Sequence, residues 1–239
     1  MLECGCGAGP DTEILLALGA KVVAVDISSV AIAKRNLGNP ANALFLRASI
    51  DDLPLRQNQF DIVFCHRVLQ HTPSPENTLK HILTFVKPGG RVFVHSYART
   101  LQQMISWKYA LRPLTRRISP ERLYRIVRYW MPALFRLTCG MRRCRPEILG
   151  RALFRFAYHT IPIRNYRFGD QFMSMDDDAM IEYAIHDTFD ALSPMYDCPI
   201  SASAMSAIAS DLLDSNFEVI GHGGVTLLRS TKLLASEAA

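Results

Sequence analysis

Apolar positions in the first hundred residues fall into short continuous runs separated by segments of helical length. Continuous runs of β-branched and aromatic residues predict strands that are buried on both faces. Segments that mix polar and apolar residues between serine, proline or glycine predict the helices. The predicted strands lie at residues 1–3, 21–26, 42–46, 60–65 and 91–96. The predicted helices lie at 11–18, from a cap at Ser28 or Ser29 to Leu37, and at 75–86, before the turn Lys87-Pro88-Gly89-Gly90.

This alternation predicts an α/β fold with a doubly wound, mostly parallel, Rossmann-like sheet. From Tyr97 to about Asp178 helical signals dominate, which predicts a helical insertion after the fifth strand. A helix at 205–215 and strands at 217–221 and 225–229 then return the chain to the sheet. We expect a core at 1–97 with a truncated first strand, a lid at 98–178, the return at 179–232 and a tail at 233–239.

Composition narrows the class of protein. The chain has 239 residues, 49% hydrophobic and 21% charged, which fits one large domain or one domain with a sizeable insertion. Disordered, collagen-like and coiled-coil classes are excluded. No apolar run approaches the roughly 18 residues that cross a bilayer. Six cysteines without a CxxC pair or a secretory leader predict free thiols, a cytoplasmic location and no metal site, with zinc at Cys139 and Cys144 disfavoured.

Charge is distributed unevenly along the chain. The segment 99–167 holds 16 Lys or Arg and only two acids, so it carries a formal charge of +14. The rest of the chain is acidic, and the net charge of +5 conceals this division. A basic segment of this kind predicts an anionic partner.

The segment Glu3 to Gly9 reads ECGCGAG at a predicted strand-to-helix junction. Glycines let the turn tighten and let backbone N–H groups approach a ligand. Asp26 ends the next strand, 17 residues beyond Gly9, where a carboxylate can accept from ribose hydroxyls. Together these features indicate an adenosine-containing cofactor. A dinucleotide is disfavoured, because its third glycine would fall at Pro10 and Glu3 has no role beside a pyrophosphate.

These residues resemble the class I S-adenosylmethionine-dependent methyltransferases, in particular the broad type 11 group. The resemblance covers about residues 1–97 and rests on four motifs in order: LECGCGAG, VVAVDIS, DDLPLRQNQFDIVFCHRVLQHTPSP and LKHILTFVKPGGRVFV. It implies S-adenosylmethionine as the cofactor. The implied cofactor-binding residues are Glu3, Gly5 and Gly7 toward the methionine part, Asp26 at the ribose, Ile27, Ser49 and Ile50 around the adenine, and Cys65 near the sulfonium. Many relatives have an aspartate where Ser49 stands, a contact that Asp51 or Asp52 would have to replace.

A base that takes the proton of an acceptor hydroxyl is expected in such a reaction but is not obligatory. His71 is the first candidate, because it follows the fourth strand at the edge where open α/β sheets bind ligands. The alternative for His71 is a cap of the following helix. His95, at the end of the fifth strand, is a further pocket-lining candidate.

The segment HDTFDALSPMYDCP, residues 186–199, resembles one in methyltransferases of glycolipid, surface-glycan and natural-product pathways. It contributes Asp187 and Tyr196 as catalytic candidates on the substrate side. His186 and Asp190 lie four residues apart, but without a third ligand we favour a surface helix over a metal site.

Residues 119–137 predict an amphipathic helix that Pro132 breaks, with arginines largely outside the apolar stripe. The stripe consists of Leu123, Ile126, Val127, Trp130 and Leu134. This pattern suits an anionic membrane surface, or equally a lid helix that packs its stripe on the sheet domain. Interleaved arginines and aromatic residues are also typical of proteins that bind RNA. The sequence contains no recognised RNA-binding module, so a nucleic-acid partner is disfavoured.

We therefore expect a cytoplasmic methyltransferase, with peripheral association at the inner membrane surface as an alternative to a location free in the cytoplasm. Its acceptor would be a small-molecule or lipid-linked hydroxyl, of a glycan, a quinone-like compound or a polyketide. The alternatives are an RNA methyltransferase and a non-catalytic relative that docks through the basic segment. The acceptor atom and the oligomeric state are not determined by the sequence.

Overall fold

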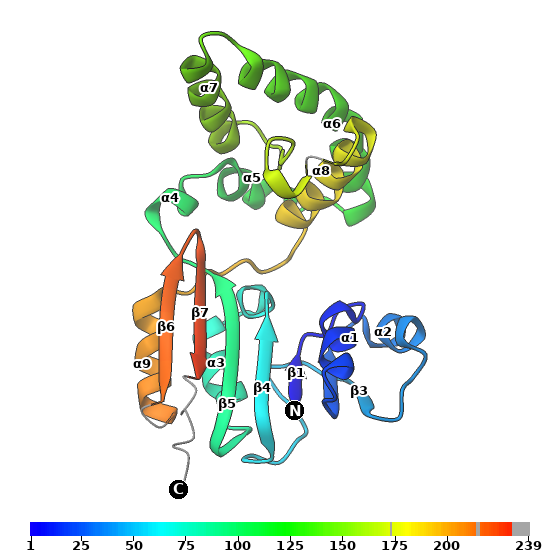
Figure 1. Cartoon of the computed structure of the whole chain (residues 1–239), viewed down its shortest axis with the longest axis vertical. Helices are drawn as coiled ribbons and strands as arrows, with labels where there is room; N and C mark the ends of the chain where they lie inside the picture. Colours follow the sequence, from blue (N-terminus) through cyan, green and yellow to red (C-terminus); the bar gives the residue numbers. More distant parts are fainter. Residues whose placement is uncertain (173, 214–215, 231–239) are drawn as a thin grey trace, which may run out of the picture. The chain divides into compact units, whose positions relative to one another are not determined.

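The computed structural model describes residues 1–172, 174–213 and 216–230, and the chain divides into two compact units. One unit contains Met1–Thr100 and the chain from Tyr196 onward, and it holds the sheet (Figure 1). The other unit, Leu101–Met195, is helical. The predicted tail at 233–239 and the end of the predicted helix at 205–215 lie outside the described residues.

The sheet of the described chain has seven strands in the order β3-β2-β1-β4-β5-β7-β6. Their bounds are β1 Leu2–Cys4, β2 Val22–Asp26, β3 Ala43–Arg47, β4 Phe60–His66, β5 Val86–Tyr97, β6 Phe217–His222 and β7 Val225–Ser230. Strands β1 to β5 pair in parallel, and β7 is antiparallel to both β5 and β6. The predicted doubly wound, mostly parallel α/β sheet is confirmed.

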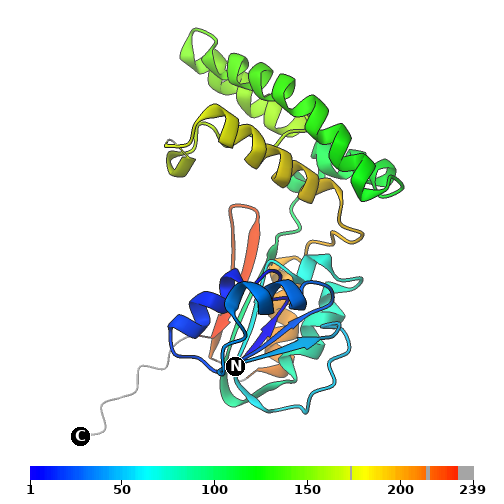
Figure 2. The ribbon, with the colours of Figure 1, turned by 90° about the vertical axis from the view of Figure 1, so that its right-hand side faces the viewer.

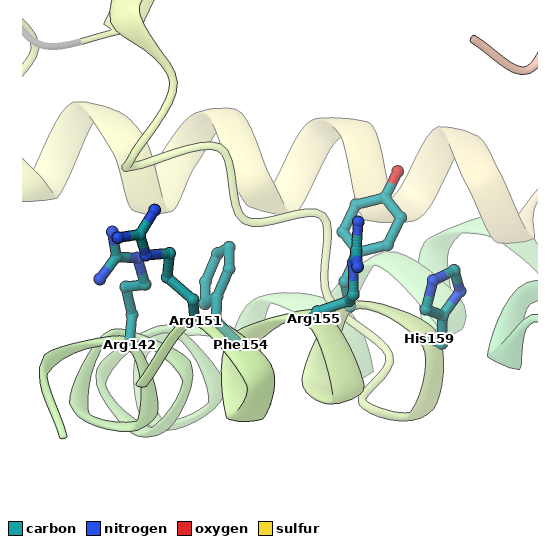
Figure 3. Close-up of a pocket in the computed structure, with 6 residues that line it drawn as sticks. Arg142, Arg151, Phe154, Arg155 and His159 are labelled. Carbon is teal, nitrogen blue, oxygen red and sulfur yellow. The ribbon is translucent and has the colours of Figure 1, made fainter. Parts of the chain in front are cut away.

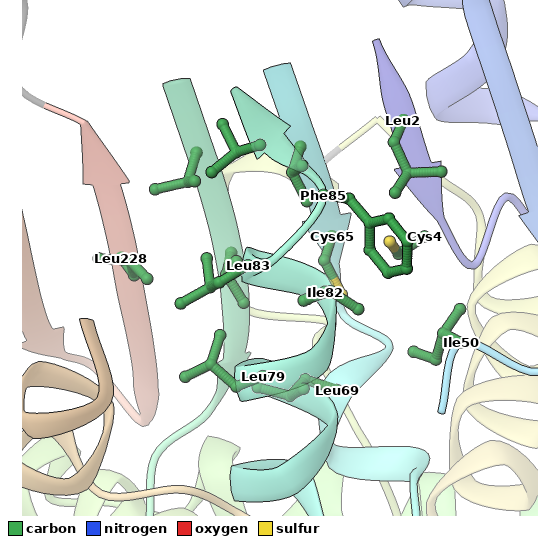
Figure 4. Close-up of a cluster of buried hydrophobic side chains, with 14 of the residues drawn as sticks. Leu2, Cys4, Ile50, Cys65, Leu69, Leu79, Ile82, Leu83, Phe85 and Leu228 are labelled. Atoms are coloured by element: carbon green, nitrogen blue, oxygen red, sulfur yellow. The ribbon is translucent and has the colours of Figure 1, made fainter. Parts of the chain in front are cut away.

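Helices cover both faces of this sheet, as the nearly continuous apolar strands predict. They are α1 Pro10–Ala17, α2 Val30–Leu37, α3 Pro75–Leu83 and α9 Ala202–Leu212, with a short 3-10 turn, η1, at Leu69–His71. Alternate residues of β2 face opposite sides: Val22 and Ala24 pack against α2, and Val25 belongs to the core beneath α3 and α9. Figure 4 shows the larger core, where Leu79 and Ile82 of α3 lie over the strands.

The segment Lys87 to Gly90 lies within β5 and does not form the predicted turn between helix and strand. Phe60 pairs with Val86 and Ile62 pairs with Arg91, so the intervening residues form a bulge in the strand. Gly89 has a φ of 71°, a conformation that favours glycine. The preceding helix, α3, accordingly ends at Leu83 instead of Val86.

The helical unit contains α4 Leu101–Met104, α5 Trp107–Thr115, α6 Pro120–Arg143, α7 Glu147–Thr160, the 3-10 turn η2 Asp170–Phe172 and α8 Asp177–Leu192. Helix α6 packs against both α7 and α8 (Figure 2). Its core joins Met131 and Phe135 of α6 to Met180 and Ile185 of α8. Because α8 buries its apolar side chains in this core, the unit extends to Met195, whereas the sequence placed the return to the sheet at residue 179.

Helix α6 differs from its prediction in two ways. It continues through Pro132, because burial of Met131 and Phe135 on either side offsets the loss of one backbone hydrogen bond. Its buried stripe is Leu123, Val127, Met131 and Phe135, at a spacing of four. Ile126 and Trp130, which the sequence placed in the stripe, are 48% and 56% exposed.

Candidate functional site

The glycine turn between β1 and α1 lies at the carboxyl edge of the parallel strands. Gly5, Gly7 and Gly9 all have positive φ, at 82°, 53° and 101°. A Cβ on Gly5 would lie 2.2 Å from Val68 Cγ2, and one on Gly9 would lie 2.9 Å from Leu37 Cδ1. A Cβ on Gly7 would meet no described atom within 4 Å. Gly5 and Gly9 are therefore required by packing, whereas Gly7 borders open space from which a ligand can approach the backbone.

Asp26, at the end of β2, holds this turn. Its Oδ2 accepts from the Gly7 N–H at 3.0 Å, and its Oδ1 accepts from the N–H groups of Ser28 and Ser29, each at 2.8 Å. A carboxylate oxygen has two lone pairs, so Oδ2 keeps one acceptor position for a hydroxyl group. Asp26 thus links the turn to the β2–α2 loop and retains the capacity that was predicted for it.

Glu3 lies beneath the turn and is 1% exposed. Its Oε2 accepts a hydrogen bond of 2.7 Å from the Thr12 hydroxyl, whereas Oε1 is buried with no partner among the described residues. Burial raises the pKa of Glu3 to about 7; the Thr12 hydrogen bond opposes this shift and the nearby Asp11 adds to it. An unpaired buried carboxylate oxygen is costly and suits a cationic or hydrogen-bonding ligand group.

The predicted adenine-side residues lie in different environments. Ile27 is 65% exposed at the end of β2, and Ile50 is buried in the core. The Ser49 hydroxyl accepts from the Asp51 N–H at 3.2 Å, and the Asp51 carboxylate also accepts from the Thr78 hydroxyl. Because Asp51 is held within this loop, its carboxylate is partly used in the protein's own structure.

Cys65 is a correction to the predicted site. It is fully buried beside Leu2 and Cys4 in the core beneath α3 (Figure 4). Burial raises the pKa of its thiol to about 12. Strand alternation directs Cys65 and its neighbour His66 to opposite faces of the sheet, so the Cys65 side chain belongs to the core and not to a ligand site.

Two of the three predicted catalytic residues lie together. The His71 ring is bonded through Nδ1 to the backbone carbonyl of Tyr196 at 3.2 Å and meets the Tyr97 ring edge-on. This arrangement differs from the alternative of a helix cap, since α3 begins after Ser74 with no side-chain cap. Asp187 belongs to the helical unit, where its carboxylate accepts a hydrogen bond of 2.9 Å from the Tyr166 hydroxyl.

Sequence reasoning missed a hydrogen-bonded pair of side chains at the same edge of the sheet. His66, the last residue of β4, contacts Asp11 of α1 through Nδ1 and Oδ2, 2.8 Å apart. The His95 ring lies 5.0 Å from the His66 ring, and His95 Nδ1 is buried with no partner among the described residues. The strand alternation could have predicted that His66 faces away from the core, because residues 64 and 66 alternate with the core positions 63 and 65. The contact with Asp11, which is 55 residues away, was not predictable from spacing.

Nothing in the described part of the chain gathers three or more His, Cys, Asp or Glu side chains in a metal-binding arrangement. His186 is exposed on α8 and lies against the Tyr124 ring. This placement agrees with the surface-helix interpretation of that segment.

The chain is similar to known methyltransferases over its N-terminal part. Residues 2–94 match the family model described as a methyltransferase domain. A ubiquinone biosynthesis O-methyltransferase of Acinetobacter baumannii is 32% identical over 123 residues, which cover 48% of this chain and 52% of that protein. The protein of the same description from Burkholderia pseudomallei is 30% identical over 143 residues, which cover 54% and 62%. The chain thus spans about half the length of the curated relatives it matches.

Among solved structures, an S-adenosylmethionine-dependent methyltransferase from Mesorhizobium loti is 25% identical with a TM-score of 0.38, over 41% of this chain and 46% of that one. A carbon methyltransferase structure, CurJ, is 12% identical with a TM-score of 0.47, over 96% and 47%. The family match covers β1 to β5, including the glycine turn, Glu3 and Asp26. The match to the methyltransferase domain covers residues 2–94, and over this part the chain is similar to the methyltransferases named above.

Proposed function

We propose that this chain transfers the methyl group of S-adenosylmethionine to a hydroxyl group of a small-molecule or lipid-linked acceptor. The observation that carries the proposal is the buried, unpartnered Oε1 of Glu3 beneath a glycine turn with open space at Gly7. A structural turn alone has no need of a half-paired buried carboxylate, which costs free energy.

The residues of the turn fit this cofactor. Glu3 Oε1 would accept from the ammonium of the methionine part, and the free acceptor position of Asp26 Oδ2 would take one ribose hydroxyl. Ile27 would contribute exposed apolar surface beside the adenine, with Ser49 and Ile50 behind it. When bound, the cofactor supplies an electrophilic methyl group, so the protein's task is to position the acceptor and to accept its proton.

Among acceptors we favour a quinone-like aromatic hydroxyl over a glycan or a polyketide. The support is the similarity of the N-terminal part to proteins described as ubiquinone biosynthesis O-methyltransferases. We also propose substrate-side roles for His71 and Tyr196 in the sheet unit and, separately, for Asp187 in the helical unit. An RNA methyltransferase and a non-catalytic docking protein are the competing functions.

The proposal is tested by calorimetric titration of the full chain with S-adenosylmethionine and S-adenosylhomocysteine. We expect binding by the wild type and a loss of at least a hundredfold in affinity for Asp26→Ala, because the substitution removes both the ribose acceptor and the anchor of Gly7. Asp61→Ala is the matched control, since Asp61 is an exposed carboxylate in β4 that pairs with Lys87.

Equal affinities in the two variants would contradict the assignment of Asp26. A folded wild type that binds neither ligand would favour the docking protein. Copurifying nucleic acid that dissociates steeply with rising salt would favour the RNA enzyme.

A second function, contact with an anionic membrane surface, is favoured by the exposed side of α6. This α6 outer face carries Ile126, Tyr129, Trp130 and Leu137, between 48% and 76% exposed, together with Arg122, Arg125 and Arg136. Glu121 is the only acid in the sequence of α6. Apolar and aromatic side chains among arginines suit the headgroup region of anionic lipid. No helix among the described residues is long and apolar enough to cross a membrane.

A basic hollow in the same unit supports this proposal. Arg142, Arg151, Phe154, Arg155 and His159 line a hollow of about 370 Å³. Figure 3 shows these side chains, with Arg142 and Arg151 next to the Phe154 ring. Glu147 is the acid that pairs with Arg142 and Arg151, at 3.7 and 3.3 Å. The remaining positive charge would attract lipid phosphate groups.

Vesicle sedimentation tests the membrane contact. We expect the wild type to bind phosphatidylglycerol vesicles and not phosphatidylcholine vesicles. Arg122→Glu/Arg125→Glu should reduce the affinity for phosphatidylglycerol vesicles at least tenfold, because each basic residue near an anionic surface contributes about 1 kcal/mol of binding free energy. The control is Lys34→Glu/Arg35→Glu, which makes the same charge change on exposed positions of α2. Equal losses in both double variants would indicate a net-charge effect and overturn the assignment of this face.

A further inference from the structure

We propose that His66 is the general base that takes the proton from the acceptor hydroxyl, with Asp11 as its positioning residue. This inference rests on the proposed methyltransferase function and assigns to it a pair of residues that sequence reasoning left without a role. His66 is the catalytic residue of the pair, because it would touch the acceptor. Asp11 would act through His66.

The contact between the two side chains sets the proton positions. His66 Nδ1 and Asp11 Oδ2 are 2.8 Å apart. A carboxylate only accepts hydrogen bonds, so the neutral imidazole donates Nδ1–H to Asp11 and carries its free lone pair on Nε2. The side chains of His66 and Asp11 are 27% and 34% exposed, which keeps the pair ordered and still open to a substrate. This is the arrangement in which a carboxylate orients a histidine base.

The position of the pair points to the reacting end of the cofactor. Asp11 stands two residues after Gly9, in the first turn of α1, and the next residue, Thr12, donates to Glu3 at 2.7 Å. Asp11 is also close enough to Glu3 to raise its pKa. His66 is the last residue of β4, at the carboxyl edge of the sheet. The pair therefore lies beside the residues that would hold the methionine part, which carries the methyl group.

The neighbours of His66 complete a partly apolar site. The rings of Phe64 and Phe93 lie 6.0 and 6.3 Å from the His66 ring, and an aromatic acceptor would find ring surfaces there. His95 lies 5.0 Å away, and its pKa is lowered by burial and by the charges of His66 and Arg67.

The proposed step combines a proton transfer to His66 with the transfer of the methyl group from sulfur to oxygen. The acceptor hydroxyl gives its proton to His66 Nε2, and its oxygen forms a bond to the methyl carbon. The carbon–sulfur bond breaks and its electron pair stays on sulfur, which leaves neutral S-adenosylhomocysteine. The proton then leaves His66 for water. His71, whose ring is hydrogen-bonded to the backbone carbonyl of Tyr196, is the competing base.

The first experiment follows histidine ring signals by NMR in the full chain with S-adenosylhomocysteine bound. We expect the neutral His66 ring to hold its proton on Nδ1 in the wild type and to distribute it over both ring nitrogens in Asp11→Ala, because the carboxylate that accepts from Nδ1 is then removed. Asp61→Ala is the matched control, at an aspartate paired with Lys87 elsewhere on β4. An unchanged His66 tautomer in Asp11→Ala would overturn the pairing.

The second experiment measures methylation of catechol and hydroquinone. We expect His66→Asn to lower kcat by about a hundredfold or more, with the affinity for S-adenosylhomocysteine within threefold of wild type. Asp11→Ala should lower kcat while the KM for the acceptor and the affinity for S-adenosylhomocysteine stay near those of the wild type, a split that a merely structural residue would not cause. The control is His222→Asn, at the exposed end of β6.

The outcomes separate this inference from the proposed function. Wild-type turnover with an undiminished kcat in His66→Asn overturns the inference and leaves the methyltransferase in place. If His71→Asn shows the loss instead, His71 is the base. A wild type that binds the cofactor but methylates neither probe counts against the aromatic-hydroxyl acceptor and the base together.

Discussion

Between pH 4 and pH 8 the free energy of unfolding of Glu3→Gln is expected to rise by about 3 kcal/mol relative to that of the wild type. Burial raises the pKa of Glu3 from 4.5 to about 7, so the folded state binds a proton more tightly than the unfolded state does. Stability attributed to this group is present below pH 4.5 and is lost as the pH rises through about 7. Glutamine has no charge to lose, so the difference between the two proteins should grow toward pH 8.

Urea unfolding at pH 4, 6 and 8 measures this effect, with the pH-dependent difference as the readout. Glu13→Gln is the control, because it removes one carboxylate from an exposed position of the neighbouring helix α1. Parallel stability curves for the wild type and Glu3→Gln would show that Glu3 is not held protonated by burial.

The same substitution should weaken S-adenosylmethionine binding by tenfold or more, because an amide replaces the carboxylate that would meet the ammonium. A cation beside Glu3 would favour its charged form, so binding at pH 7 should release a proton from the wild type and not from Glu3→Gln. Calorimetry in two buffers of different ionisation enthalpy measures that proton. If the release is the same in both proteins, Glu3 does not face the cofactor.

Gly5→Ala is expected to destabilise the fold by about 3 kcal/mol and to abolish cofactor binding. The left-handed backbone at Gly5, with a φ of 82°, costs a non-glycine residue roughly 1–2 kcal/mol. The added Cβ would also lie 2.2 Å from Val68 Cγ2, and relief of such an overlap costs roughly 1–3 kcal/mol more. Chemical denaturation and calorimetry measure the two effects.

Gly19→Ala provides a matched control for the backbone term. Gly19 has a φ of 85°, but its Cβ would meet no described atom within 4 Å. Gly19→Ala should therefore be destabilised by about 1 kcal/mol, the cost of the left-handed backbone alone. The double variant Gly5→Ala/Val68→Ala should recover part of the remainder. Equal losses at Gly5 and Gly19 would show that the contact with Val68 is relieved without cost.

The sheet was predictable because its determinants are local. The runs at 21–26 and 60–65 are mostly apolar and rich in β-branched and aromatic residues, and such runs are typical of buried parallel strands. The glycine turn and Asp26 were predictable for a similar reason, since a positive φ and a strand end are properties of short segments. The bulge at residues 87–90 was missed because Pro and Gly also mark ordinary turns.

The helical unit was less predictable, because a helix shows its apolar stripe without showing which partner covers it. Ile126 and Trp130 fit the stripe by spacing, yet contact with α7 and α8 selected Val127, Met131 and Phe135 for burial. The same contacts stabilise α6 on both sides of Pro132 and make α8 part of the helical unit.

The sequence by itself determined the α/β class, the cofactor family and the turn that identifies it, because these depend on residues close together in the chain. The tertiary structure alone decided that Cys65 faces the core while His66 faces Asp11 across 55 residues. It also decided that one oxygen of Glu3 is buried with no hydrogen-bond partner in the described part of the chain. Burial and long-range contacts set these properties, and they arise only when distant segments pack against one another.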